Sequence, residues 1–269
     1  TKVKELHFYD FDFESFATEE GILRLQAQKG YRKKFIGRGL IDALKTNEHH
    51  IVIDDSPRYI FESHIIPARV NCVSPWVKII ATLRNPIDRA FSQYNMLQTV
   101  ADVRQKVYNI TFEDWILKDI QDLKRTGVLP KEGTVSSFAN DAKDSQMMME
   151  IEASWKEYTR LGTHAPIGRG LYAIQLQQWM NTFKGDILVL QNEQMERDPD
   201  QVYKRILNFL HLSDEPLKNI MKKVNKGNYK SRVLNPATRK MLEKLYDPYN
   251  QDLYHLLGGN NWIDAWDPV

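Results

Sequence analysis

Apolar residues recur along the chain in two kinds of pattern, and these two kinds alternate with each other. Short runs rich in β-branched residues at 77–83 and 186–191 predict buried strands, and alternating residues at 5–8 and 50–54 predict two more. Apolar residues at helical spacing predict helices over residues 19–28, 87–98, 112–124, 170–183, 199–210, 215–224 and 236–257. We expect the last helix to break near Pro248, because proline removes a helical hydrogen bond. Strands separated by helices indicate an α/β fold, with a central parallel sheet flanked by helices.

The pattern weakens and turns polar between residues 100 and 167. A chain of 269 residues that is 42% hydrophobic fits one globular domain. We therefore predict a single domain over residues 1–269, with a variable, substrate-facing insertion at about 100–167. The three consecutive methionines at 147–149 either face the substrate there or fill the core.

Composition narrows the possible partners and compartments. A net charge of +2 gives no reason to expect a nucleic acid partner, and no apolar run reaches the length of a membrane span. Cys72 is the only cysteine, which excludes an intramolecular disulfide and a cysteine-based metal site. A single cysteine favours the cytoplasm, whereas the Asn109-Ile110-Thr111 triplet permits a secretory location such as the Golgi lumen. Localisation and oligomeric state both stay open.

The most informative segment is 77–94, which runs from the predicted strand through a turn into a helix. Pro86 suits a first helical turn, because its missing N–H would have no partner there. Free N–H groups at a helix start favour an anion, and Arg84 adds a planar, permanently charged group. Ser92 lies about two turns further on. The segment predicts a phosphate site, although an arginine that pairs with a carboxylate and an ordinary surface serine would give the same letters.

The letters L-R-N-P-x-x-R-x-x-S-x-Y, which start at Leu83, resemble the 3′-phosphate motif of sulfotransferases that use 3′-phosphoadenosine 5′-phosphosulfate (PAPS). In that family the residues matching Arg84 and Ser92 hold the 3′-phosphate, whereas the residue matching Arg89 has no clear role. Residues 168–199 resemble the second block of the family, which is mainly scaffold. The resemblance implies a P-loop-like α/β fold, PAPS as donor, adenosine 3′,5′-bisphosphate as product, and no metal.

A second candidate site opens the chain, where Glu5 and His7 place a carboxylate beside an imidazole. Such a pair is suited to general acid–base chemistry, although an exposed strand face carries the same residues. The segment K-E-L-H-F-Y-D at 4–10 resembles the K-E-x-H-F-F-D segment of carbohydrate sulfotransferases, including the heparan sulfate 3-O-sulfotransferases. There the glutamate matching Glu5 is the proposed base, and the residues matching His7 and Asp10 line the site.

The resemblance implies transfer of a sulfuryl group from PAPS to an acceptor hydroxyl, on a carbohydrate first and on a small-molecule alcohol second. A base is needed because a hydroxyl is a poor nucleophile at neutral pH. A non-catalytic nucleotide- or glycan-binding relic is the rival. A kinase-like phosphoryl transferase is disfavoured, because the sequence has no Walker lysine.

Two departures from the family pattern support the rival. The family places a lysine just before a T/S-P turn, and Asp55 stands at that position, so Arg58 is our candidate for the lysine's work. The family's K-x-G-T-T donor loop, which lies ahead of the segment at 4–10, is absent from the sequence. The letters K-E-G-T at 131–134 are a coincidence of composition, because no strand precedes them. The simpler explanation for the absent loop is that this sequence lacks the natural N-terminus, and such a loop shortly before Thr1 would favour the enzyme over the relic.

A basic loop at 225–232 precedes the last predicted helix, and such loops are often merely solvated. Its position resembles that of the family loop that closes over the adenine and the 3′-phosphate. The resemblance makes nucleotide-binding candidates of Lys226, Gly227, Tyr229, Lys230, Ser231 and Arg232.

Overall fold

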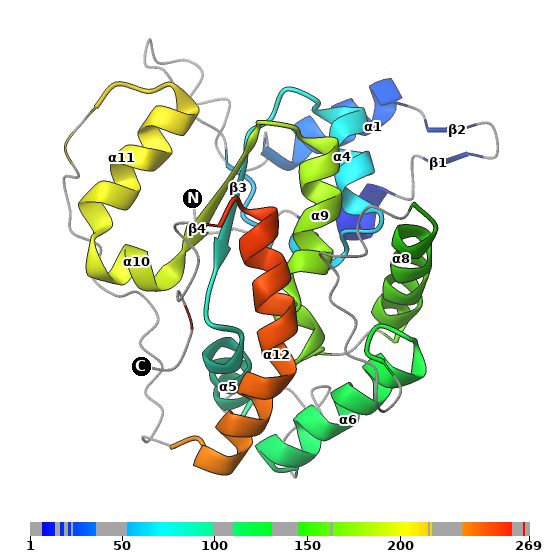
Figure 1. Ribbon diagram of the computed structural model, residues 1–269. Coiled ribbons are helices and arrows are strands. Elements are labelled where there is room, and N and C mark those ends of the chain that lie inside the picture. The colour runs from blue at the N-terminus through cyan, green and yellow to red at the C-terminus, as the bar shows by residue number, and fades with distance from the viewer. Residues whose placement is uncertain are drawn as a thin grey trace. The chain divides into compact units, whose positions relative to one another are not determined.

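The structure is a computed structural model, shown as a ribbon in Figure 1. It describes residues 7–13, 17–18, 21–22, 24–35, 53–98, 110–130, 145–161, 164–214, 216, 233–259 and 266. The chain divides into two compact units, one of Thr1–Ile79 with Gln178–Ile187 and one of Ile80–Gln177 with Leu188–Val269.

The elements follow in chain order. The first part of the chain forms the π-helical turn η1 (Phe8–Asp12), the strands β1 (Ala17–Thr18) and β2 (Gly21–Ile22), and the helices α1 (Arg24–Phe35), α3 (Arg58–Phe61) and α4 (Ile66–Val73). The remainder forms β3 (Ile79–Leu83), α5 (Pro86–Leu97), α6 (Phe112–Arg125), α8 (Ser145–Arg160), the 3₁₀ turn η4 (Gly168–Gly170), α9 (Tyr172–Thr182), β4 (Ile187–Gln191), α10 (Asn192–Arg197), α11 (Pro199–Leu210) and α12 (Pro236–Leu256).

The core of the first unit is built around aromatic side chains from η1 and its C-terminal end. Phe8, Tyr9 and Phe13 are almost completely buried and pack with Ile66 and Val70 of α4. η1 contacts α3 and α4, and α1 contacts α4. Burying three large aromatic groups contributes several kcal/mol at roughly 25 cal/mol per Å². Hydrophobic packing therefore fixes the turn that carries His7 and Asp10.

Arg69 of α4 adds a buried polar link to the same turn. Its Nη1 donates to the carbonyl oxygen of Tyr9 at 2.6 Å, and its guanidinium lies 5.1 Å from the centroid of the Phe13 ring. Burial lowers the pKa of Arg69, and the nearby charge of Asp10 opposes that shift. A buried charge is tolerated when it is bonded and compensated, so these contacts connect η1 to α4.

The predicted strand at 5–8 is wrong at its described end. His7 has a φ of 50°, in the left-handed region, and Phe8 opens the helical turn η1. A strand cannot continue through that conformation, and successive aromatic residues bury together on the turn instead of alternating. Residues 5 and 6 lie outside the described residues.

Other expectations for this part of the chain need similar corrections. Ile53 and Asp54 are not in a strand, and residues 50–52 lie outside the described residues. The helix expected at 19–28 begins only at Arg24 and continues to Phe35, because an antiparallel pair, β1 with β2, occupies the preceding residues.

The rest of the chain confirms most of the predicted elements. The strands expected at 77–83 and 186–191 are β3 and β4, which form a small two-stranded parallel sheet. The helices expected at 87–98, 112–124, 170–183 and 199–210 are α5, α6, α9 and α11, each within two residues at either end. The chain is thus helix-rich α/β, and the P-loop-like detail stays a prediction. The helix expected at 215–224 lies outside the described residues, apart from the non-helical Pro216.

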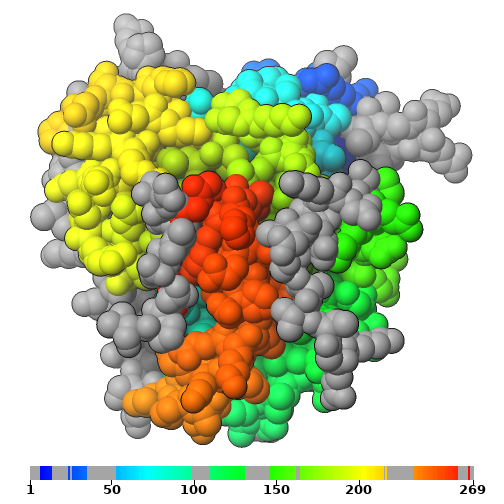
Figure 2. Space-filling view, in the orientation of Figure 1, coloured from blue at the N-terminus to red at the C-terminus, as the bar shows by residue number. Residues whose placement is uncertain are grey.

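α12 runs unbroken from Pro236 to Leu256, so the predicted break near Pro248 is wrong. Proline at that position removes the bond to the carbonyl of Lys244. Lys244 is exposed, and α12 forms part of the surface in Figure 2, so water reaches that side of the helix. Tyr246, Tyr249 and Leu253 bury the other side and hold the helix together across the proline.

A buried carboxylate joins α6 to α8 and η4. Asp119 accepts hydrogen bonds from the hydroxyl of Tyr158 at 2.7 Å, from the N–H of Ile167 at 2.7 Å and from the N–H of Gly168 at 3.1 Å. Burial raises the pKa of Asp119, and these three donors act against that rise. A Cβ on Gly168 would lie 2.2 Å from the Tyr158 hydroxyl, so glycine is required where the backbone approaches so closely.

Replacing Asp119 with alanine should lower the free energy of unfolding by about 3 kcal/mol, because three buried donors lose their acceptor together. Urea denaturation measures this loss. The control is Asp122→Ala on the same helix, which removes only an ion pair with the exposed Arg125 and should cost less than about 1 kcal/mol. Similar losses in the two variants would show that Asp119 has no special structural role.

Candidate functional site

The turn between β3 and α5 is fixed by Asn85, and Figure 1 shows β3 leading directly into α5. The Asn85 side chain accepts from the N–H groups of Ile87 at 3.0 Å and Asp88 at 3.2 Å. Its own N–H donates to Glu193 Oε1 at 2.7 Å, and its carbonyl accepts from Arg89 N at 2.9 Å. The expectation of free N–H groups at this helix start is therefore wrong, because a capping asparagine has bound them.

Unlike the amides of this helix start, the two side chains predicted to hold a phosphate are not bonded to other described residues. Arg84 and Ser92 are both half-buried. Within the described part of the chain, neither the Arg84 guanidinium nor the Ser92 hydroxyl has a hydrogen-bond or ion-pair partner. The backbone of Arg84 is held, since its carbonyl accepts from the Tyr172 hydroxyl at 2.9 Å. A fixed backbone with a side chain that has polar groups to spare suits an anion site.

Arg89 has a different role from Arg84, although both belong to the motif. Its guanidinium donates to Gln93 Oε1 at 2.9 Å and to the carbonyl oxygen of Pro166. These bonds connect α5 to the segment before η4, and η4 contacts α5. The structure therefore gives Arg89 a structural task, which the sequence left unassigned.

The face of α5 that carries Ser92 also carries an ion pair that the sequence did not predict. Asp88 lies one helical turn before Ser92, and its Oδ1 accepts from Arg239 Nη2 at 2.6 Å. Thr238 donates to Glu113 Oε1 at 2.9 Å, so the first turn of α12 is bonded to both α5 and α6. The signal available in the sequence was Asp88 itself, one turn from Ser92, but its partner lies 151 residues away.

The predicted nucleotide loop lies outside the described residues. It includes Lys226, Gly227, Tyr229, Lys230, Ser231 and Arg232. In the sequence it leads into α12, whose first turn is held beside α5 by the Asp88–Arg239 pair. α5 and α12 are in contact within the second unit.

In the first unit, the structure brings His7 and Asp10 together. His7 Nδ1 lies 2.8 Å from Asp10 Oδ2. The carboxylate orients the imidazole, and Nδ1–H is the group suited to donate to it. Glu5, the proposed base, lies outside the described residues.

The position of His7 depends on a carboxylate that the sequence analysis did not single out. Asp54 accepts hydrogen bonds from the hydroxyls of Ser56 at 2.8 Å and Tyr59 at 3.1 Å. Ser56 Oγ accepts in turn from His7 N at 3.2 Å, and the Tyr59 hydroxyl accepts from Phe8 N at 3.0 Å. These bonds hold the backbone of His7 in its left-handed conformation. Burial raises the pKa of Tyr59, so its hydroxyl stays protonated.

Arg58, our candidate for the work of the missing lysine, is already engaged. Its Nε donates to Glu62 Oε1 at 2.6 Å, and its Nη2 lies 2.5 Å from the same oxygen. Its guanidinium lies 5.2 Å from the ring centroid of Phe11. Asp55, at the family lysine position, is exposed. A role for Arg58 toward a donor sulfate stays a prediction, for which Nη1 is the nitrogen that does not contact Glu62.

The described residues contain no group of three or more His, Cys, Asp or Glu side chains arranged to hold a metal ion. No helix among them is long and apolar enough to cross a membrane.

A small parallel sheet in a helix-rich chain defines an α/β protein. Comparison with known proteins identifies the family: the family model described as "Sulfotransferase domain" matches residues 3–249. The chain therefore belongs to the sulfotransferase domain family.

Individual relatives are distant. The chain is 24% identical over 236 residues to heparan sulfate glucosamine 3-O-sulfotransferases 3A1 and 3B1 of Mus musculus. Each alignment covers 80% of this chain and 50% of the relative, so the chain spans about half the length of these relatives. Among solved structures, a sulfotransferase from Alicyclobacillus acidocaldarius matches with a TM-score of 0.61 and 22% identity. That match covers 98% of this chain and 86% of the other, and it shows the fold alone.

Proposed function

We propose that this chain transfers the sulfuryl group of PAPS to an acceptor hydroxyl, with Glu5 as the general base. The observation that carries the proposal is the state of Arg84 and Ser92, which have no partners among the described residues although they sit on the strand–turn–helix of a sulfotransferase domain. The rivals are a small-molecule alcohol as acceptor and a binding protein without activity. Asp55, at the position of the family lysine, favours the binding protein.

The donor set fits the 3′-phosphate of the nucleotide. Arg84 offers a planar cation and Ser92 a hydroxyl, and charge-assisted hydrogen bonds of this kind are strong. Because Asn85 takes up the first amides of α5, the side chains carry the recognition. Lys230, Ser231 and Arg232 complete the phosphate site in the proposal, with Lys226, Gly227 and Tyr229 nearer the adenine.

Arg239 contributes to the same site through Asp88. A carboxylate one turn from Ser92 repels a phosphate bound there. The ion pair of Asp88 with Arg239, at 2.6 Å, cancels that charge. Arg239 is thus a positioning residue, which keeps the face of α5 near Ser92 compatible with an anion.

The acceptor chemistry follows from the residues of the first unit. The acceptor oxygen attacks sulfur and gives its proton to Glu5, while the bond from sulfur to the departing phosphate oxygen breaks. His7, oriented by Asp10, offers Nε2 as a hydrogen-bonding group for the acceptor. Cationic side chains then stabilise the charge on the departing phosphate, as in phosphoryl transfer.

Two observations support a carbohydrate as the acceptor. The relatives named above act on heparan sulfate glucosamine, as their names state. In addition, Phe11 is 59% exposed, and its ring centroid lies 5.1 Å from that of His7. An exposed aromatic ring beside the acid–base residues offers an apolar surface for one face of a sugar ring.

The first prediction concerns the 3′-phosphate. Adenosine 3′,5′-bisphosphate should bind the natural protein much more tightly than AMP, and Arg84→Ala should weaken it roughly 10- to 100-fold while leaving AMP unchanged. Isothermal titration calorimetry measures both affinities. Arg160→Ala, which removes an exposed ion pair with Glu157, is the control and should change neither. Equal affinities of the natural protein for the two nucleotides would refute the assignment.

The second prediction concerns the ion pair beside Ser92. Arg239→Gln should weaken binding of adenosine 3′,5′-bisphosphate roughly fivefold, because Asp88 is left charged near the phosphate. Asp88→Asn combined with Arg239→Gln should restore affinity to within about twofold, since the double variant has no charge there. Titration of the four proteins with the bisphosphate completes the cycle. A double variant as weak as Arg239→Gln alone would show that the pair acts only through structure.

The third prediction separates the base from the nucleotide site. Glu5→Gln should abolish sulfuryl transfer and leave the affinity for adenosine 3′,5′-bisphosphate nearly intact. Arg160→Ala, which removes only an exposed ion pair with Glu157, should leave both unchanged. Transfer of radiolabelled sulfate to a heparan-type oligosaccharide is the assay. Full turnover by Glu5→Gln would remove Glu5 from the mechanism, and an inactive natural protein that binds the bisphosphate would favour the relic.

A further inference from the structure

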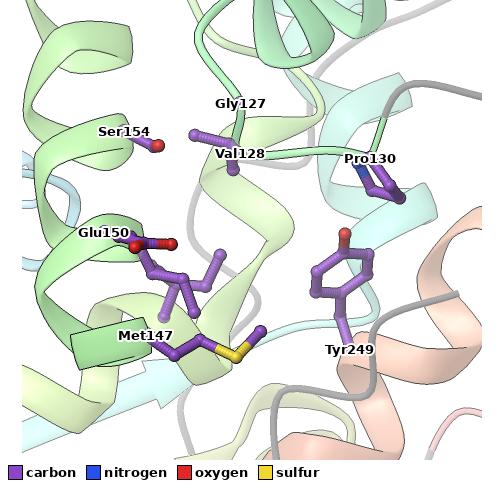
Figure 3. Close-up of a pocket in the computed structure, with 9 residues that line it drawn as sticks. Gly127, Val128, Pro130, Met147, Glu150, Ser154 and Tyr249 are labelled. Carbon is purple, nitrogen blue, oxygen red and sulfur yellow. The ribbon is translucent and has the colours of Figure 1, made fainter. Parts of the chain in front are cut away.

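The second unit contains a cavity of about 250 Å³ that no step of the proposed reaction uses. It is partly open to solvent and is lined by α8, by the turn that follows α6, and by single residues of α9 and α12 (Figure 3). Val128, Ile151 and Ile174 give it apolar walls, with Met147 at one side. Its volume lies just below the roughly 300–1,000 Å³ of drug-sized sites, so it has room for a molecule with one ring or a short chain.

Three polar side chains converge on this cavity. Glu150 and Ser154 lie one turn apart on α8, and Tyr249 lies on α12. Figure 3 shows the Ser154 and Glu150 side chains directed from α8 toward the space that the Tyr249 hydroxyl also faces. Apolar walls with a few convergent polar groups are the usual composition of a small-molecule site.

The polar groups have bonding capacity to spare. Among the described residues, none of the three side chains has a hydrogen-bond or ion-pair partner. The hydroxyls of Tyr158 and Tyr246, which are buried in the same unit, are bonded to Asp119 and to the Ile167 carbonyl. The Tyr249 side chain as a whole is buried, at 8% exposure, but its hydroxyl is not among the buried polar atoms that lack a partner. A ligand in the cavity can therefore form hydrogen bonds with the hydroxyls of Tyr249 and Ser154 in place of water.

The charge of the cavity defines the kind of ligand. Glu150 is its acidic group, and the described lining residues include no Lys, Arg or His. Burial raises the pKa of Tyr249 to about 12, with the charge of Asp252 as a smaller cause, so this phenol stays neutral at physiological pH. The cavity therefore carries one negative charge. It disfavours nucleotides, sulfated sugars and carboxylates, and favours a cation.

We propose that this cavity binds a small primary amine with an apolar body. The ammonium group pairs with Glu150 and donates to the hydroxyl oxygens of Ser154 and Tyr249. The apolar body packs against Val128, Ile151 and Ile174. None of its lining residues has an assigned role in the proposed sulfuryl transfer, although most of them belong to the insertion at 100–167 that the sequence predicts to face the substrate.

The test compares two probes of matched shape, 2-phenylethylamine and 3-phenylpropanoate, by saturation-transfer and chemical-shift titration with the whole chain. The amine should bind in a saturable manner, and the carboxylate should bind at least roughly fivefold more weakly, because it meets the charge of Glu150. Equal binding of the two probes, or no saturable binding of the amine, would overturn the proposal.

Variants then place the site. Glu150→Gln should weaken amine binding roughly three- to tenfold and remove the preference over the carboxylate, the range allowing for the exposure of this residue. Glu152→Gln, on the same helix but outside the lining, should bind like the natural chain. Ser154→Leu fills the cavity and should abolish binding of the amine, while its thermal melting by circular dichroism confirms that it is folded. Unchanged amine binding by a folded Ser154→Leu or by Glu150→Gln would locate binding elsewhere and overturn the proposal.

Discussion

The candidate donor site depends on how Asn85 bonds the turn between β3 and α5. Its side chain binds two backbone N–H groups of the helix start, and its own N–H is bound by Glu193, next to the end of β4. Glu193 is held in turn, because its other oxygen accepts from Trp266 Nε1 at 3.1 Å. A helix start without a cap would offer amides to an anion. Here those amides are occupied, so in the proposed site it is side chains that bind the anion.

Whether a phosphate binds in the proposed site therefore depends on the charges of the side chains in this turn and on α5. Arg84, in the turn before α5, provides a cation, and Ser92 on α5 provides a hydroxyl, whereas Asp88 on α5 brings a negative charge. Asp88 at the helix start stabilises α5 through the helix dipole, yet the same charge opposes a phosphate near Ser92. The ion pair with Arg239 satisfies both requirements. Asp88 keeps its favourable interaction with the dipole of α5, while the net charge of the Asp88–Arg239 pair is zero. The pair also places α12 against α5, so one contact serves both folding and electrostatics.

Local signals in the sequence predicted much of the fold. α11 begins and ends where its pattern predicted, because Asp198 caps it and Pro199 suits its first turn. The same logic placed α5 after Asn85 and α12 after Asn235. The strand expected at 5–8 failed because Phe8 and Tyr9 are adjacent in the sequence and both buried, which an alternating strand does not allow. α12 continues past Pro248 because Tyr246 and Leu253 are buried. The predicted break considered only the proline and not this burial.

For the site, the sequence motif identified Arg84 and Ser92, but not what surrounds them. The partner of Asp88 lies 151 residues away, and no pattern within a window of the sequence connects the two. The sequence also did not predict the role of Asp54. Its carboxylate acts on His7 through a hydrogen bond with Ser56 and not by direct contact.

These networks also separate the two halves of the proposed chemistry. The contacts that orient His7 come from Asp10, Ser56 and Tyr59, all within the first unit, whereas those around Arg84 and Ser92 belong to the second. Residues without shared partners act additively on free energy. Substitutions that disturb the orientation of His7 therefore leave the preference for a 3′-phosphate in place, and changes beside Ser92 leave the acid–base residues in place. A protein that lost its activity through the acid–base segment would keep its nucleotide site, and a relic of this family would be recognised by that combination.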